Sequence, residues 1–217
     1  DPSERSHALD VLGFEKQIVL GTFAFHQIAH ENDKKALEIG ARVYNRAMGR
    51  FCAHDDRLLA GGYVPLSLGP DIAGALLDEA FNDGCYTVMI DTNEANPEAQ
   101  SFTHPDFDPV WARFAEQNVP VILHIAVNGH YDPVSPSFKN NGRGSTALGG
   151  DAPDSNLGLI AMHNSAELFL SAMIFDEVFE RHDRLRCLSL EHGASWVPGW
   201  LHKLDFVEPS LNIFLIL

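Results

Sequence analysis

Basic residues, paired cysteines and long apolar runs are all scarce in this chain of 217 residues. Its 15 Lys and Arg side chains are outnumbered by 30 Asp and Glu side chains, and the formal net charge of -15 disfavours nucleic acid and anionic membrane surfaces as partners. Cys52, Cys85 and Cys187 are odd in number and widely spaced, so a reducing compartment is expected rather than a disulfide framework. No apolar run reaches bilayer length, and the first residues lack a secretory pattern. We therefore expect a soluble, cytoplasmic protein without a membrane partner.

Several catalytic signatures are also missing. No candidate strand is followed by the GxGxxG turn of dinucleotide-binding folds. The nearest match to the GxSxG of serine hydrolases begins at Gly193 but has Val197 in place of the second glycine. The HExxH of zinc proteases fails at Lys34. His26 and His30 have helical spacing, but no third ligand is near them in the sequence, so an exposed or structural pair is the favoured interpretation.

The chain does contain a regular alternation of apolar strands and helices. A hydrophobic content of 45% supports one globular domain over residues 1–217. Strands are predicted to begin near Lys16, Arg57, Tyr86, Val121, Arg186 and Ile213, and helices are predicted over 3–12, 31–51, 71–83, 109–118 and 165–181. This order is typical of an α/β protein with a parallel sheet covered by helices. In a closed barrel of this kind, the active site lies at the carboxyl ends of the strands.

Two histidines fall at such strand ends. His192 ends the strand of the segment LRCLSLEHGASWVP, where alternation places Leu188, Leu190 and His192 on one face and Ser189 on the other. His124 ends the similar segment VPVILHIAV. Each could be a buried structural histidine, a metal ligand, or a general acid or base near pH 7, and spacing does not separate these roles.

The long loops supply candidates for substrate binding. Arg143 lies in a Gly-, Ser- and Asn-rich stretch over 128–156 and could bind a substrate carboxylate, although a solvated arginine is the simpler interpretation. The aromatic residues Phe102, Phe107, Trp111 and Trp196 could line an aromatic pocket or belong to the ordinary core.

Four segments together resemble one known family. They are YNRAM at 44–48, RLLAGGYVPL at 57–66, HPDFDPVWARFAEQNVPVILH at 104–124 and ERHDRLRCLSLEHGASWVPGWLHKLD at 180–205. They resemble the branch of the amidohydrolase superfamily that includes aminocarboxymuconate-semialdehyde decarboxylase. The resemblance implies a (β/α)8 TIM barrel that hydrolyses or non-oxidatively decarboxylates a small carboxylated substrate, aromatic acids included. It further implies one divalent metal ion bound by His124, with zinc preferred and manganese or iron as alternatives, and His192 as the acid or base. Arg143 and Trp196 are the candidate substrate-binding residues.

The chain departs from this family at two places. The resemblance also implies an HxH pair on the first barrel strand and an aspartate after the last, and the sequence contains neither. Six strand candidates are two fewer than a closed barrel needs. We expect the given sequence to be incomplete at its start, near 207–212 and at its end. The alternative is a catalytically inactive barrel relic that serves as a binding or assembly protein. A homo-oligomer, most simply a dimer, is expected in either case.

Overall fold

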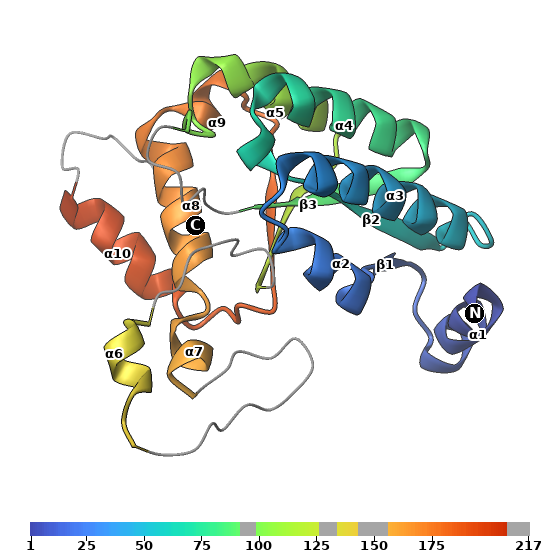
Figure 1. The fold of residues 1–217 in the computed structure, drawn as a ribbon, viewed down its shortest axis with the longest axis horizontal. Helices are drawn as coiled ribbons and strands as arrows, with labels where there is room; N and C mark the ends of the chain where they lie inside the picture. The colour runs from blue at the N-terminus through green and yellow to red at the C-terminus, as the bar shows by residue number, and fades with distance from the viewer. Residues whose placement is uncertain (92–98, 126–133, 143–155, 208–217) are drawn as a thin grey trace.

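The computed structural model describes residues 1–91, 99–125, 134–142 and 156–207, in which five strands alternate with helices (Figure 1). The strands are β1 (Gln17–Val19), β2 (Leu58–Val64), β3 (Cys85–Ile90), β4 (Val121–His124) and β5 (Cys187–Leu190). The α-helices are α1 (Pro2–Leu12), α2 (Thr22–Ala29), α3 (Lys34–Cys52), α4 (Pro70–Asn82), α5 (Asp108–Gln117), α6 (Pro136–Lys139), α7 (Asn156–Ala161), α8 (Asn164–Phe175), α9 (Val178–Arg181) and α10 (Val197–Val207). Two short 3-10 helices, η1 (Leu66–Leu68) and η2 (Pro105–Phe107), precede α4 and α5.

The five strands form one parallel sheet in the order β1-β2-β3-β4-β5. Helices lie between consecutive strands, as parallel pairing requires, and the sheet curls into a half-barrel (Figure 1). The predicted helix-covered parallel sheet and its first five strands are confirmed. The strand predicted at Ile213 lies outside the described residues, and eight-stranded closure stays a prediction.

Helices α3, α4 and α5 lie side by side against the sheet, with α3 over β2 and α4 over β2 and β3 (Figure 1). The buried Asn45 of α3 exchanges two hydrogen bonds with the backbone of Tyr63 in β2, at 2.9 and 2.6 Å. The preceding Tyr44 accepts a hydrogen bond from the backbone N–H of Gly21, at 2.9 Å. The Tyr-Asn pair of the YNRAM segment therefore fixes α3 to the strand layer. A Cβ at Gly49 would stand 1.9 Å from the carbonyl oxygen of Asp83, so the close approach of α3 to the turn after α4 requires glycine there.

The helix predictions need several corrections, and α6, α7 and α10 were not among the predicted helices. The first helix begins at Pro2, and its cap is Asp1, whose side chain accepts a hydrogen bond from the backbone N–H of Ser3. Helix α2 was not predicted, because its eight residues carry no polar cap and follow a strand directly. The helix predicted over 165–181 is two helices, α8 and α9, because Glu177 adopts a left-handed conformation with φ 58°.

All four candidate pocket aromatics belong to the core or pack directly against it. Phe107 and Trp111 are 1% and 0% exposed. Phe102 stacks on Phe169 of α8, with ring centroids 4.3 Å apart, and its carbonyl oxygen accepts a hydrogen bond from the indole N–H of Trp111 at 3.0 Å. These rings join the segment after β3 to α8. Of the two alternatives considered for them, an aromatic pocket or the ordinary core, the structure supports the core.

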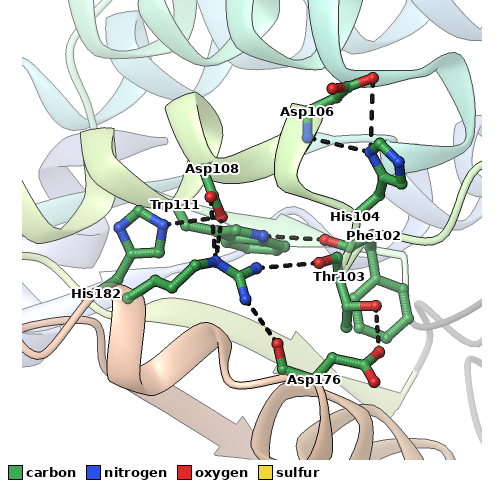
Figure 2. Close-up of polar contacts among 9 residues, drawn as sticks. Phe102, Thr103, His104, Asp106, Asp108, Trp111, Asp176 and His182 are labelled. Carbon is green, nitrogen blue, oxygen red and sulfur yellow. Dashed lines mark hydrogen bonds and ion pairs between the residues drawn. The ribbon is translucent and has the colours of Figure 1, made fainter.

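A polar network crosses the same boundary. Arg181 of α9 donates hydrogen bonds to both carboxylate oxygens of Asp108, at 3.0 and 3.1 Å, and to the carbonyl oxygens of Asp176 and Thr103. His182 Nε2 lies 3.1 Å from Asp108 Oδ1, and the hydroxyl of Thr103 donates to the Asp176 carboxylate (Figure 2). Asp108 belongs to the HPDFDP segment, and Arg181 and His182 belong to ERHD. The charged residues of these two segments therefore hold α5 against the α8–α9 junction.

The cysteines and the His26–His30 pair agree with their predictions. Cys52, Cys85 and Cys187 are all free thiols. His26 and His30 are exposed at the end of α2, and their rings meet edge to face with centroids 4.5 Å apart.

One helical stretch passes a composition test for membrane spans, contrary to the expectation that no run would. The stretch covers residues 156–175, which comprise α7 and α8, and it is apolar and mostly not buried. A turn at Met162 and His163 separates the two helices, and α8 packs into the core through Phe169 and Met173. One such stretch is weak evidence for a membrane span, because core helices meet the same criterion.

Candidate active site

The two candidate histidines lie at the carboxyl edge of neighbouring strands. His124 is the last residue of β4, is paired in register with Leu190 of β5 and is 4% exposed. His192 follows β5 by two residues and is 5% exposed. Because His124 pairs with Leu190, His192 lies two residues beyond its partner position on the neighbouring strand. The structure thus brings both predicted residues to one edge of the sheet.

The orientation of His192 differs from the strand alternation. The strand ends at Leu190, and Glu191 and Gly193 on either side of His192 adopt left-handed conformations with φ 66° and 68°. This turn brings the imidazole back toward Ser189, whose Oγ lies 2.9 Å from Nδ1 of His192. The prediction that Ser189 and His192 lie on opposite faces is therefore wrong, because alternation stops where φ changes sign.

The other ring nitrogen of His192 is exceptional. Nε2 is buried and has no hydrogen-bond partner among the residues that the structure describes. The pKa of His192 is lowered to about 4, mainly by burial and to a smaller extent by the neighbouring His124 and His163. Its ring is therefore neutral at pH 7, with Nδ1 beside the Ser189 hydroxyl and Nε2 without a hydrogen-bond partner among the described residues.

His124 faces an aromatic wall and a carboxylate. Its ring meets Phe25 of α2 edge to face at 6.3 Å, and Phe25 in turn meets Tyr63 of β2 at 4.9 Å. Nε2 of His124 lies 3.7 Å from Oε1 of Glu191, whose side chain is 56% exposed. The first residue after β5 thus places an anionic group beside the imidazole at the end of β4.

Asp91 is a buried carboxylate at the same edge, and it was not among the predicted site residues. It follows β3 directly, is 7% exposed, and accepts hydrogen bonds from the backbone N–H groups of Leu66 at 3.0 Å and Ser67 at 3.5 Å. It also bonds the buried hydroxyl of Tyr63, which contributes to the raised pKa of that tyrosine after the larger effect of burial. Burial raises the pKa of Asp91 itself to about 6, in opposition to its hydrogen bonds. An acidic residue immediately after the apolar run YTVMI was the available signal.

The raised pKa of Asp91 gives a prediction about stability. An acid whose pKa is higher in the folded state than in the unfolded chain favours folding while both states are protonated, and this contribution is lost as the pH rises through about 6. The free energy of unfolding of the native protein, relative to Asp91→Asn, should therefore fall by about 2 kcal/mol between pH 4 and pH 7. Urea titrations of both proteins at several pH values measure this difference. A constant difference across that range would contradict the buried carboxylate.

The candidate substrate residues have different outcomes. Trp196 is 9% exposed, donates its indole N–H to the carbonyl oxygen of Gly193 at 3.0 Å and stacks on His163 with ring centroids 5.8 Å apart. Arg143 lies outside the described residues. His163, in the turn between α7 and α8, was not predicted, because a histidine in a short linker between helices carries no sequence signal for a site.

The fit of a divalent metal ion can be tested on the donors present. His124 and the unpartnered Nε2 of His192 offer nitrogen donors, and Glu191 offers an exposed carboxylate near His124. Among the described residues, however, no three His, Cys, Asp or Glu side chains gather closely enough to hold an ion. The chemical types of these donors suit a divalent ion, but the described residues supply fewer ligands than a complete site needs.

A curled parallel sheet of five strands with buried histidines at its carboxyl edge is the arrangement expected of a partial α/β barrel. Residues 18–210 match the sequence profile of the amidohydrolase family, described as Amidohydrolase, and the chain therefore belongs to this family. The resemblance noted from the sequence is confirmed. Comparison with curated protein sequences gives no match.

Several solved structures have a fold similar to that of this chain. An amidohydrolase from Mycobacterium avium subsp. paratuberculosis K-10 superposes with a TM-score of 0.73 at 24% identity, over 96% of this chain and 53% of that one. A 2,6-dihydroxybenzoate decarboxylase from Rhizobium gives 0.66 at 20% identity, over 96% and 61%. A 5-carboxyvanillate decarboxylase variant from Novosphingobium aromaticivorans, with bound manganese and a hydroxylated nitrobenzoic acid, gives 0.64 at 19%, over 96% and 55%. The chain thus spans between half and two thirds of the length of these proteins.

Proposed function

We propose that the chain belongs to a divalent-metal-dependent enzyme that non-oxidatively decarboxylates small aromatic carboxylic acids. The observation that carries the proposal is the pair of buried histidines at adjacent strand ends, one of which has an unpartnered ring nitrogen. The chain's family and the aromatic-acid decarboxylases of the same fold support it. Hydrolysis on the same scaffold is the second candidate, supported by the family itself.

His124 is proposed as a metal ligand. Its imidazole is buried at the end of β4, where a neutral ring suits a divalent ion, and Glu191 adds a carboxylate at 3.7 Å. When bound, such an ion polarises a substrate oxygen or a water molecule. Sequence analysis preferred zinc, but the neighbouring decarboxylases bind manganese, and we therefore propose manganese first.

His192 is proposed to move the proton. Its ring is neutral near pH 7, and Nε2 is the atom that gains or loses the proton. The Ser189 hydroxyl at Nδ1 both donates and accepts hydrogen bonds, so it partners the ring in either tautomer. A substrate carboxylate that enters this buried region adds negative charge and raises the proton affinity of His192. The same event that delivers the substrate thus prepares His192 to carry the proton.

Arg143 and Trp196 remain the proposed substrate-binding residues, for the carboxylate and the aromatic ring respectively. A single domain, a small-molecule substrate and a dimer also stay predictions. The non-catalytic relic differs from these proposals in one measurable respect, because it requires no metal.

The test is a decarboxylation assay on the full-length protein loaded with manganese. A panel of hydroxy- and methoxybenzoic acids labelled with 13C at the carboxyl group should release labelled carbon dioxide, and phenyl esters and amides of the same acids should not be hydrolysed. Hydrolysis without carbon dioxide release would favour the second candidate. A protein that binds no metal and turns over neither set would support the relic and overturn the proposal.

A further inference from the structure

The turn that carries His192 is held from outside by a stacked pair of rings. Glu191 adopts a positive φ of 66°, a conformation that is unfavourable for a residue with a Cβ, and Gly193 has φ 68°. The His192 ring has one hydrogen bond among the described residues, at Nδ1 to Ser189, and its buried Nε2 has none. A strained turn whose central side chain has one hydrogen bond depends on its surroundings for support.

Trp196 provides that support. Its indole N–H donates to the carbonyl oxygen of Gly193 at 3.0 Å, which closes the turn directly after His192. One neighbour of its ring is Trp200 of α10, with centroids 5.6 Å apart and planes at 51°. Another is His163, whose ring lies nearly parallel, at 16° and 5.8 Å. Trp196 is 9% exposed and is therefore enclosed by these contacts.

His163 is itself anchored on two helices. Its Nε2 lies 3.6 Å from Oε2 of Glu167, one turn later along α8. Glu167 also binds Lys203 of α10 at 2.6 Å, and its side chain is only 14% exposed. The indole N–H of Trp200 donates to Ser171 Oγ at 2.8 Å, a second tie between α8 and α10. His163 thus reaches Trp196 from a fixed position.

We propose that His163 is a positioning residue for His192, which acts through its stacking on Trp196. The ring of His163 holds the indole in place, the indole holds the carbonyl group of Gly193, and this turn aims Nε2 of His192 toward the reacting atoms. An effect of His163 on turnover rests on the proposed function. The first measurement is therefore made without substrate.

Three substitutions separate the stacking from the ion pair. His163→Phe keeps a flat ring against Trp196 and loses the partner of Glu167. His163→Gln keeps a hydrogen-bonding group for Glu167 and loses the ring, and His163→Leu loses both. His202→Leu, at an exposed histidine of α10, is the matched control.

The first readout is the indole N–H signal of Trp196 in a protein labelled with 15N at its three tryptophans, assigned by comparison with Trp196→Phe. In His163→Gln and His163→Leu, hydrogen exchange of this group should become at least about tenfold faster, while Trp111 is unchanged. His163→Phe and His202→Leu should behave as the native protein. If His163→Leu does not fold, the comparison of His163→Gln with His163→Phe still separates the stacking from the contact with Glu167.

The second readout is turnover of the metal-loaded protein. Loss of an aromatic contact worth about 0.5–1.5 kcal/mol corresponds to a two- to thirteenfold effect, so kcat should fall by about tenfold in His163→Gln, with KM within twofold and metal content unchanged. His163→Phe should restore most of kcat. If His163→Gln keeps native exchange and kcat while His163→Phe loses them, the contact with Glu167 and not the stacking is what matters, and the proposal is overturned. Native-like exchange in all three variants would also overturn it. If the native protein turns over nothing, the proposed function fails, and the exchange measurement still decides the role of His163.

Discussion

Replacement of His124 by Ala should remove the bound metal and abolish turnover. The imidazole at the end of β4 is a buried nitrogen donor 3.7 Å from the Glu191 carboxylate, and a methyl group offers no electron pair to an ion. Even residues that only orient a ligand contribute 10- to 100-fold to metal affinity, so the loss of a ligand should weaken binding by more than about 100-fold. Elemental analysis after gel filtration, alongside the decarboxylation assay, measures both effects.

His26→Ala is the matched control, because His26 is an exposed histidine on α2 with no place in the candidate site. It should retain full metal content and full activity. Circular dichroism and thermal unfolding should show that the His124 variant remains folded. Stoichiometric manganese in a folded His124→Ala protein would exclude His124 as a ligand.

The strands and their parallel pairing could be predicted because they depend on local composition and on the alternation of strands with helices. β2, β3 and β4 are nearly continuous apolar runs, and such runs between helices favour parallel pairing whatever the tertiary detail. Their carboxyl ends then had to meet at one edge. This is why His124 and His192 could be placed near each other from the sequence alone.

The geometry of the site could not be predicted, because it depends on residues in unusual backbone conformations. Glu191 and Glu177 both adopt positive φ, which sequence patterns assign to glycine or asparagine. At Glu191 this ends the alternation and turns His192 toward Ser189. At Glu177 it divides one predicted helix into α8 and α9. Both effects arise from the tertiary packing around these residues.

The segments that identify the family contain structural residues as well as the two candidate histidines. Asn45 bonds the backbone of β2, and Asp108, Arg181 and His182 join α5 to α9 (Figure 2). Charged residues in a family-specific segment are easily assigned to the active site. Here they instead hold two helices against each other. Asp91, in contrast, lies in no such segment and is buried at the site edge.

Replacement of His192 by Gln should lower kcat/KM by about 10²- to 10⁴-fold while the metal is retained, the range typical of a lost general acid or base. Gln keeps a hydrogen-bonding group near Ser189 but cannot exchange a proton near neutral pH. The pKa of His192 is lowered to about 4 by burial, so kcat/KM of the native protein should lose activity on the acidic side near pH 4 rather than near 6.5.

The same histidine should shape the pH dependence of stability, with a sign opposite to that of Asp91. A base whose pKa is lower in the folded state stabilises the fold above its unfolded value of 6.5, and this contribution is lost as the pH falls toward 4. Native protein should therefore lose about 3 kcal/mol relative to His192→Gln between pH 7 and pH 4, whereas relative to Asp91→Asn it gains stability over that range. Urea titrations of the three proteins distinguish the two groups. Two results together would show that His192 is not the buried, neutral base. The first is a loss of native kcat/KM on the acidic side near pH 6.5, and the second is a constant difference in the free energy of unfolding between the native protein and His192→Gln across this pH range.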